Sequence, residues 1–242
     1  MMKRMYINLL MLLVMILFLS GCMYPKNELA KNKIPNEAQL ETVQHAVEQY
    51  QKETGGLVPI KTKPNETPIF EKYLIDFSLL KEKNVLTELP GNAFENGGVY
   101  QYTLLYPDNS PKVKLIDLRI TEAIRNVNVK LEAYRNKHLY PPFGQEITKG
   151  LYTIDYKKLG LDRAPHVRSP FSSENLPIIM DVDGELYVDY RIDLNQALQT
   201  YTHQYKEGDD IRFILPDNSP FVPAYSLPYT LKDGEPVFAP RK

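Results

Sequence analysis

The chain has 242 residues, with no tryptophan and a single cysteine. One cysteine cannot form an intramolecular disulfide, so the fold must depend on its hydrophobic core and not on cross-links. The chain also lacks the Gly-x-Ser-x-Gly and His-Glu-x-x-His motifs and any glycine-rich phosphate-binding loop. No local motif therefore predicts a catalytic residue, a metal site or a cofactor.

Neither sign of charge dominates the sequence, which has 29 Lys and Arg against 30 Asp and Glu. Proteins that bind nucleic acids usually have a strongly basic surface, and this charge balance does not predict one. Four histidines occur, and no two of them have the i, i+3 or i+4 spacing that chelates a metal on one helix face. We expect hydrogen-bonded or solvated roles for the histidines, which are His45, His138, His166 and His203.

An apolar run at residues 7–19 follows Lys3 and Arg4, as in a secretory signal peptide. The run is short for a bilayer span, which takes about 20 residues. It ends in Leu-Ser-Gly-Cys at residues 19–22, which resembles the lipobox of bacterial lipoproteins. The resemblance implies that residues 1–21 are removed and that Cys22 is lipidated. The alternative of a buried core cysteine fits Cys22 poorly, because the residue lies beside a polar segment.

The same resemblance implies a mature protein anchored on the extracytoplasmic face of the cell membrane by lipid on Cys22, since two or more acyl chains give stable anchoring. Loss of Lys3 and Arg4 lowers the 29 basic residues to 27, against 30 acidic ones. Residues 22–38 are polar and lack periodicity, which predicts a lipidated N-terminus and flexible tether. By leader and composition, the chain resembles small, uncharacterised membrane lipoproteins of Gram-positive bacteria.

Helical and hairpin patterns recur along the rest of the chain. Apolar residues and a tyrosine fall at i, i+4, i+7 in residues 43–50, 127–134 and 194–201, which predicts three amphipathic helices. Asn96-Gly97 and Asp183-Gly184 are typical of type I′ hairpin turns. We expect an α+β fold of two diverged helix–loop–hairpin modules with small antiparallel sheets, followed by a third partial unit. The expected ranges are 39–118, 119–193 and 194–242. The alternative is two unrelated α+β stretches that share turn chemistry.

The third unit is expected to contain a strand at residues 210–215, a Pro-Asp-Asn-Ser-Pro turn at 216–220 and a last hairpin at Asp233-Gly234. The module resembles the globular part of pseudopilins, where a helix leads through a Gly/Pro loop to a small antiparallel sheet. The residues that carry this likeness are Tyr50, Gly55, Gly56, Val58, Pro59, Tyr100, Gln101 and Tyr102.

Four carboxylates alternate near the end of the second module, at Asp181, Asp183, Asp189 and Asp193. Residues two apart on a strand share a face, so an acidic stripe can form there, and paired carboxylates serve glycoside hydrolysis. The alternative is a solvated strand face. A calcium loop is disfavoured because glycine stands at its fourth position and not its sixth.

A basic, proline-rich segment spans residues 163–170 and has no counterpart in the first module. We predict a binding loop with Arg163, His166 and Arg168 as its contacts, for an anionic envelope polymer or an acidic partner. The alternative is an insertion without function. The aromatic residues between Phe221 and Phe238 predict either an exposed binding surface or the core of an edge strand.

The leading functional hypothesis is a non-catalytic, lipid-anchored binding or scaffold module of the cell envelope, with another envelope protein or a wall polymer as partner. One alternative is the substrate-binding lipoprotein of an ABC importer, which would need a cleft between two lobes. The other is an envelope hydrolase that uses two of the aspartates at 181–193.

Overall fold

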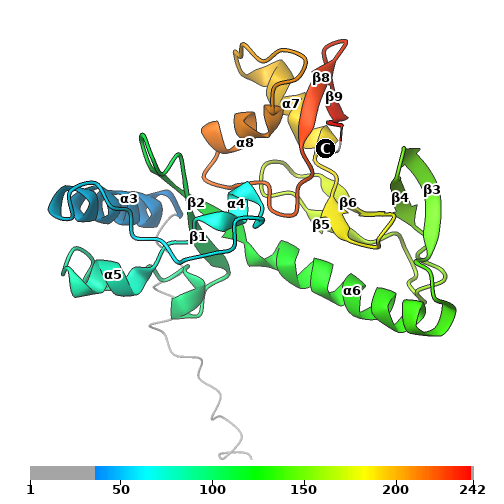
Figure 1. Cartoon of the computed structure of the whole chain (residues 1–242), viewed down its shortest axis with the longest axis horizontal. Helices are drawn as coiled ribbons and strands as arrows, with labels where there is room; N and C mark the ends of the chain where they lie inside the picture. The colour runs from blue at the N-terminus through cyan, green and yellow to red at the C-terminus, as the bar shows by residue number, and fades with distance from the viewer. Residues whose placement is uncertain (1–35, 241–242) are drawn as a thin grey trace, which may run out of the picture. The chain divides into compact units, whose positions relative to one another are not determined.

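The computed structural model describes residues 36–240, whose helices and strands are shown in Figure 1. The predicted signal peptide, the lipidation of Cys22 and most of the predicted tether lie outside the described residues. The first helix begins at Asn36, so the last three residues expected in the tether are helical. None of the helices within residues 36–240 has the length and apolar character that a membrane span requires.

The first part of the chain packs a long helix on a two-stranded hairpin. The helix buries Val43, Val47 and Tyr50 at the i, i+4, i+7 positions of its pattern, and they meet buried residues of both strands. Tyr102 pairs with Leu115 in the antiparallel register. The elements are α3 (Asn36–Glu53), α4 (Ile69–Lys72), α5 (Phe77–Glu82), the 3-10 helix η1 (Phe94–Asn96), β1 (Tyr100–Leu105) and β2 (Lys112–Asp117).

The second part packs one long helix on a five-stranded antiparallel sheet. Strand β6 is central, because it pairs with β4, β5 and β7, while β3 pairs with β4. The helix contributes Ile120, Ile124, Val127 and Leu131 to the largest core cluster, which also contains the buried residues of β6. The elements are α6 (Leu118–His138), β3 (Phe143–Thr148), β4 (Leu151–Ile154), β5 (His166–Arg168), β6 (Asn175–Asp181) and β7 (Leu186–Val188).

The last part joins the first two. The N–H of Leu115 in β2 donates to the carbonyl of Pro220 at 2.9 Å, and the N–H of Val222 donates to the carbonyl of Leu115 at 3.0 Å. A small apolar cluster combines Phe70 and Ile116 with Val222. The elements are α7 (Arg191–Thr200), the 3-10 helix η2 (Ile211–Phe213), α8 (Ile214–Asp217), β8 (Tyr229–Lys232) and β9 (Glu235–Phe238).

The α+β class with small antiparallel sheets is confirmed. The hairpin turn at Asp183-Gly184 is confirmed between β6 and β7, and the turn at Asp233-Gly234 between β8 and β9. The two expected modules differ in their sheets, since the first has two strands and the second five. Their origin by duplication stays a prediction, and so do the domain boundaries.

Two expected elements are wrong. Gly97 ends η1 in the left-handed conformation, with φ of +82°, and the β1–β2 hairpin reverses later, between Leu105 and Lys112. Residues 210–215 do not form a strand, because the Asp210 carboxylate accepts a hydrogen bond from the N–H of Arg212 and starts η2. In both places, side-chain or glycine capping of a helical turn overrides the turn and strand propensities of the residues.

Candidate functional site

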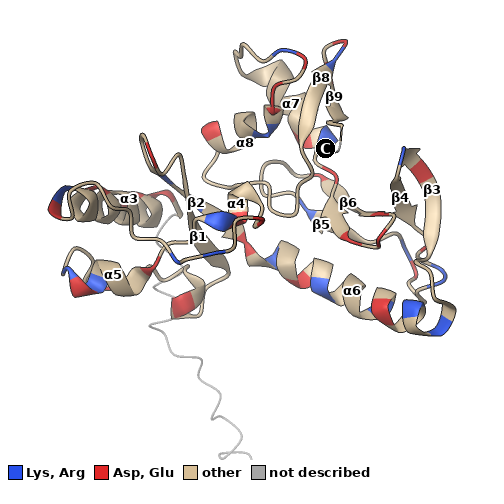
Figure 2. Ribbon diagram, in the orientation of Figure 1, with Lys and Arg blue, Asp and Glu red and all other residues tan. Residues whose placement is uncertain are grey.

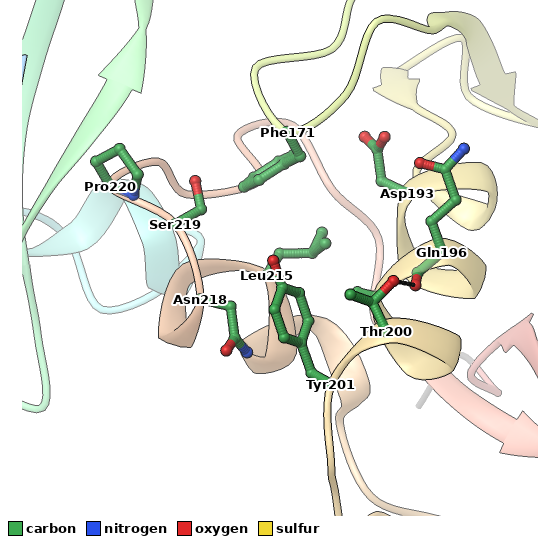
Figure 3. A pocket seen from close by; sticks show the side chains of 10 residues that line it. Phe171, Asp193, Gln196, Thr200, Tyr201, Leu215, Asn218, Ser219 and Pro220 are labelled. Carbon is green, nitrogen blue, oxygen red and sulfur yellow. Dashed lines mark hydrogen bonds between the residues drawn. The ribbon is translucent and has the colours of Figure 1, made fainter.

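A pocket of about 290 Å³ lies between α7, α8 and the loop that follows β5 (Figure 3). In that view Phe171 and Tyr201 lie at opposite ends of the pocket. The side chains from α7 lie on one side, and Asn218 to Pro220 lie on the other. The lining residues are Phe171, Asp193, Gln196, Ala197, Thr200, Tyr201, Leu215, Asn218, Ser219 and Pro220.

Helix α7 supplies the polar side of the pocket. The N–H of Arg191, the first residue of the helix, donates to the Asp189 carboxylate at 3.1 Å, which ties the start of the helix to the segment before it. Leu194 and Ala197 are buried in the core. Asp193, Gln196 and Thr200 recur at i, i+3, i+7, so they share the neighbouring face and reach the pocket together.

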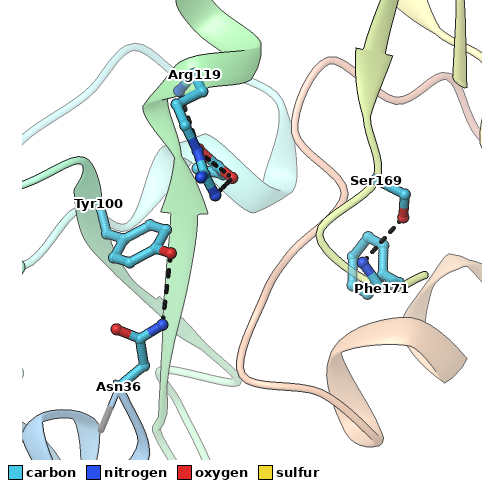
Figure 4. A network of polar contacts seen from close by, with 6 residues as sticks. Asn36, Tyr100, Arg119, Ser169 and Phe171 are labelled. Carbon is cyan, nitrogen blue, oxygen red and sulfur yellow. Dashed lines mark hydrogen bonds and ion pairs between the residues drawn. The ribbon is translucent and has the colours of Figure 1, made fainter. Parts of the chain in front are cut away.

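The Asp193 carboxylate holds the loop that forms the upper wall. Its two oxygens accept hydrogen bonds from the hydroxyls of Ser172 at 2.7 Å and Ser169 at 2.8 Å. The Ser169 hydroxyl oxygen in turn accepts from the N–H of Phe171 at 2.9 Å, a contact seen in Figure 4. Burial raises the pKa of Asp193, although both serine bonds act to lower it. This arrangement positions the Phe171 ring in the pocket wall.

The opposite wall begins at α8 and leads to the first hairpin. The Asn218 amide donates to the carbonyl of Ile214 at 2.9 Å, which leaves the side-chain carbonyl of Asn218 as an acceptor. The Ser219 hydroxyl oxygen accepts from the N–H of Phe221 at 3.2 Å. The Lys114 ammonium donates to the carbonyl of Ser219 at 2.8 Å, so β2 supports this wall from behind.

The pocket offers hydrogen bonds and apolar surface without a cation. Among its described lining residues there is no Lys, Arg or His, and Asp193 is the sole carboxylate. Gln196 is exposed, and its amide has no hydrogen bond within residues 36–240, so it is available to a ligand as donor and acceptor. Such a set of groups suits recognition of a neutral polar molecule.

The four aspartates expected in one stripe do not lie on one strand. Asp181 ends β6 and accepts hydrogen bonds from the N–H of Asp183 at 3.0 Å and of Glu185 at 2.9 Å. Asp189 lies two residues before α7, and Asp193 lies in its first turn. Asp181, Asp189 and Asp193 are buried, so the alternative of a solvated strand face is wrong as well. Within the described part of the chain, no three acidic, His or Cys residues are placed to hold a metal ion.

The basic segment is partly a strand and lies outside the pocket. His166 to Arg168 form β5, which pairs with β6, so the expected loop is wrong for these residues. Arg163 and Arg168 are exposed and His166 is half-buried. The structure therefore separates Arg163, His166 and Arg168 from the lining of the pocket. Their binding role stays a prediction.

An Asp-x-Arg triplet, which matches none of the motifs considered above, occurs three times, at residues 117–119, 189–191 and 210–212. In each case the arginine Nε and Nη2 atoms bind the aspartate carboxylate as a fork at the start of a helix. Each guanidinium also lies over an aromatic ring, at 5.8 Å for Tyr100, 4.9 Å for Phe238 and 5.0 Å for Phe70. Repetition of the triplet before helical segments is the signal that would have found it.

The triplets also place two of the C-terminal aromatic residues. Phe238 packs on Tyr229 and under Arg191, and Phe221 packs on Tyr100. Tyr100, which Arg119 covers, accepts a hydrogen bond from the Asn36 amide at 3.4 Å (Figure 4). Both phenylalanines thus pack inward against other elements.

Residues 36–117, from α3 to β2, match the sequence model of the YphF family N-terminal domain. The pocket residues all follow this range in the chain. No curated protein and no solved structure matches the chain. In its first described part, the chain is thus similar to the N-terminal domain of the YphF family.

Proposed function

We propose that the protein is a lipid-anchored, extracytoplasmic binding module of the cell envelope, and that its binding site is the pocket between α7 and α8. The leader and Cys22 support the location. The observation that carries the binding role is the pocket lining, in which uncharged donors and acceptors combine with two aromatic rings. Small-molecule sites combine aromatic and apolar walls with a few polar groups, and this pocket has both kinds of group, with a larger polar share.

The contacts of Asp193 favour binding over hydrolysis. General acid–base catalysis needs a group that can exchange a proton with the ligand, and paired-carboxylate hydrolysis needs a second acid nearby. Both oxygens of Asp193 already accept hydrogen bonds from serines that hold the loop. No second carboxylate is among the described lining residues. Asp193 therefore acts as a support of the pocket.

Photo-crosslinking in intact envelopes tests this proposal. A photoreactive amino acid replaces Tyr201, which lies at the pocket and is 40% exposed. The matched control carries the same group at Val129, which is 65% exposed on α6 and lies outside the pocket lining. We expect a discrete adduct from position 201 in the membrane fraction and no corresponding adduct from position 129.

The Cys22→Ala version of the Tyr201 probe tests the location in the same experiment. Without the lipid site, the protein should leave the membrane fraction and the adduct should weaken or vanish. Identical adducts from positions 201 and 129 would contradict the proposed site. Unchanged membrane retention of the Cys22→Ala protein would contradict the proposed anchor.

A further inference from the structure

We infer that the pocket between α7 and α8 holds one ring of a neutral sugar, of the N-acetylated hexosamine type. This inference rests on the proposed function and narrows its ligand class. It is supported by the size of the pocket, its hydrogen-bonding groups and its aromatic rings. It is also supported by the lack of cationic side chains among the described lining residues.

The size of the pocket limits the ligand to a small molecule or to one unit of a polymer. Its volume is about 290 Å³. Pockets for small molecules are usually between about 300 and 1,000 Å³, so this one is just below that range. One six-membered ring with its substituents is of this scale, while a helix or a folded protein segment is not. A polymer would bind through a single unit.

The polar groups match a molecule with several hydroxyls and an amide. Gln196 offers an amide donor and a carbonyl acceptor. The carbonyl of Asn218 is an acceptor, and the Ser219 hydroxyl retains its proton as a donor because its oxygen accepts from the chain. The Thr200 hydroxyl donates to the backbone carbonyl of Gln196 at 2.7 Å, so the Thr200 hydroxyl oxygen remains available as an acceptor. Sugar hydroxyls both donate and accept, which satisfies such a mixed set.

The aromatic side chains supply the apolar contact that a sugar ring needs on its C–H face. Phe171 is half-buried, and its backbone N–H donates to the Ser169 hydroxyl, so little loop entropy is lost when a ligand packs on the ring. Tyr201 is 40% exposed at the other end of the pocket and adds a hydroxyl to an apolar ring. Burial of such rings against a ligand favours binding.

The charges of the lining disfavour anionic and zwitterionic ligands. An anion would enter a pocket whose described lining has no Lys, Arg or His, and it would approach the Asp193 carboxylate. An amino acid would lack a partner for its carboxylate. A cation would find the Asp193 oxygens already bound to two serines in a residue that is 2% exposed. A neutral ligand avoids each of these desolvation costs.

Ligand-observed NMR tests the inference on the mature lipidated protein in detergent micelles, with empty micelles as background. The probes are N-acetylglucosamine, glucuronate and glucosamine, which are neutral, anionic and cationic hexose derivatives. The test variant is Gln196→Leu. The matched control is Gln199→Leu on the same helix, because Gln199 is also exposed but lies outside the pocket lining.

We expect N-acetylglucosamine to bind, and Gln196→Leu to weaken its binding about tenfold while Gln199→Leu leaves it unchanged. Tighter binding of glucuronate or glucosamine, equal effects of the two variants, or no binding of any probe would overturn the inference. The two proposals separate, because a crosslinked adduct at position 201 without sugar binding leaves the binding module standing and rejects the sugar.

Discussion

At the residue scale, Asp193 shows what alternation in the sequence can and cannot predict. The carboxylates at 181, 183, 189 and 193 are separated by even numbers of residues, which predicts one strand face. The sequence does not show that the strand ends at Val188 and that a helix begins at Arg191. Asp193 is therefore a helical residue under a loop, and its partners Ser169 and Ser172 are more than 20 residues away. Such pairing depends on tertiary packing, so local periodicity cannot reveal it.

The raised pKa of Asp193 predicts a specific pH dependence of stability. Aspartate in the unfolded chain has a pKa of about 3.9, so the folded state keeps this proton to higher pH. The stabilisation that protonated Asp193 provides is fully present below the unfolded-state pKa of about 3.9. It is lost as pH rises through the higher pKa of the folded state. In Asp193→Asn the site does not titrate. We therefore expect the free energy of unfolding of Asp193→Asn, relative to the native protein, to increase from pH 3.5 to pH 7.

Urea unfolding of both proteins at several pH values measures this difference, and carboxylates common to both cancel in it. Asp183→Asn, in the exposed hairpin turn, controls for the removal of one negative charge. A difference between Asp193→Asn and the native protein that stays constant across this pH range would show that Asp193 titrates alike in the folded and unfolded states.

At the scale of elements, the helices were predicted from their apolar spacing, while Asp-x-Arg triplets stand at the start of α6, α7 and η2. The expected faces of α3 and α6 are the buried ones, because packing a helix on a sheet rewards that periodicity directly. The expected hairpin at Asn96-Gly97 and the expected strand at 210–215 fail because capping is decided by single side chains. Basic and acidic residues are interspersed along α6 (Figure 2), which gives no further guidance on where the helix starts.

The three triplets differ in burial, which predicts different costs for the same substitution. The side chain of Arg212 is 9% exposed and that of Arg119 is 62% exposed. Lysine keeps the charge but loses the two-pronged carboxylate contact and the flat stacking on the ring. We expect Arg212→Lys to lower the free energy of unfolding by about 2 kcal/mol, in line with the value of charged hydrogen bonds. Arg119→Lys should cost roughly 0.5 kcal/mol or less, as exposed ion pairs do.

Denaturant unfolding of the two variants side by side provides the measurement, and each serves as the control for the other. Equal losses would mean that the ring contacts and the fork contribute nothing that depends on burial. A larger loss for Arg119→Lys would reverse the argument.

At the scale of the whole unit, residues distant in the sequence complete the first hairpin. Leu115 of β2 forms a parallel bridge with Phe221, and the hydroxyl of Tyr106 donates to the Asp217 carboxylate at 3.0 Å. The range that resembles the YphF N-terminal domain ends at residue 117, yet its hairpin edge is covered by the C-terminal segment. These contacts span about 100 residues of sequence. Turn residues and apolar periodicity report on neighbours in the sequence, so they could not predict these long-range contacts.

Because one unit contains both sheets, we expect the first hairpin and the second sheet to unfold together. Val222 is 1% exposed in the apolar cluster that contains Phe70 and Ile116. Val222→Ala removes two methyl groups there and should lower the free energy of unfolding by about 2 kcal/mol.

Native-state hydrogen exchange then distinguishes local from global effects: the amides of Leu104 in β1 and Ile178 in β6 should lose protection by the same amount. Val129→Ala, at an exposed position of α6, should change neither amide. Loss of protection at Leu104 alone would show instead that the first hairpin opens independently, after the C-terminal segment has dissociated from it.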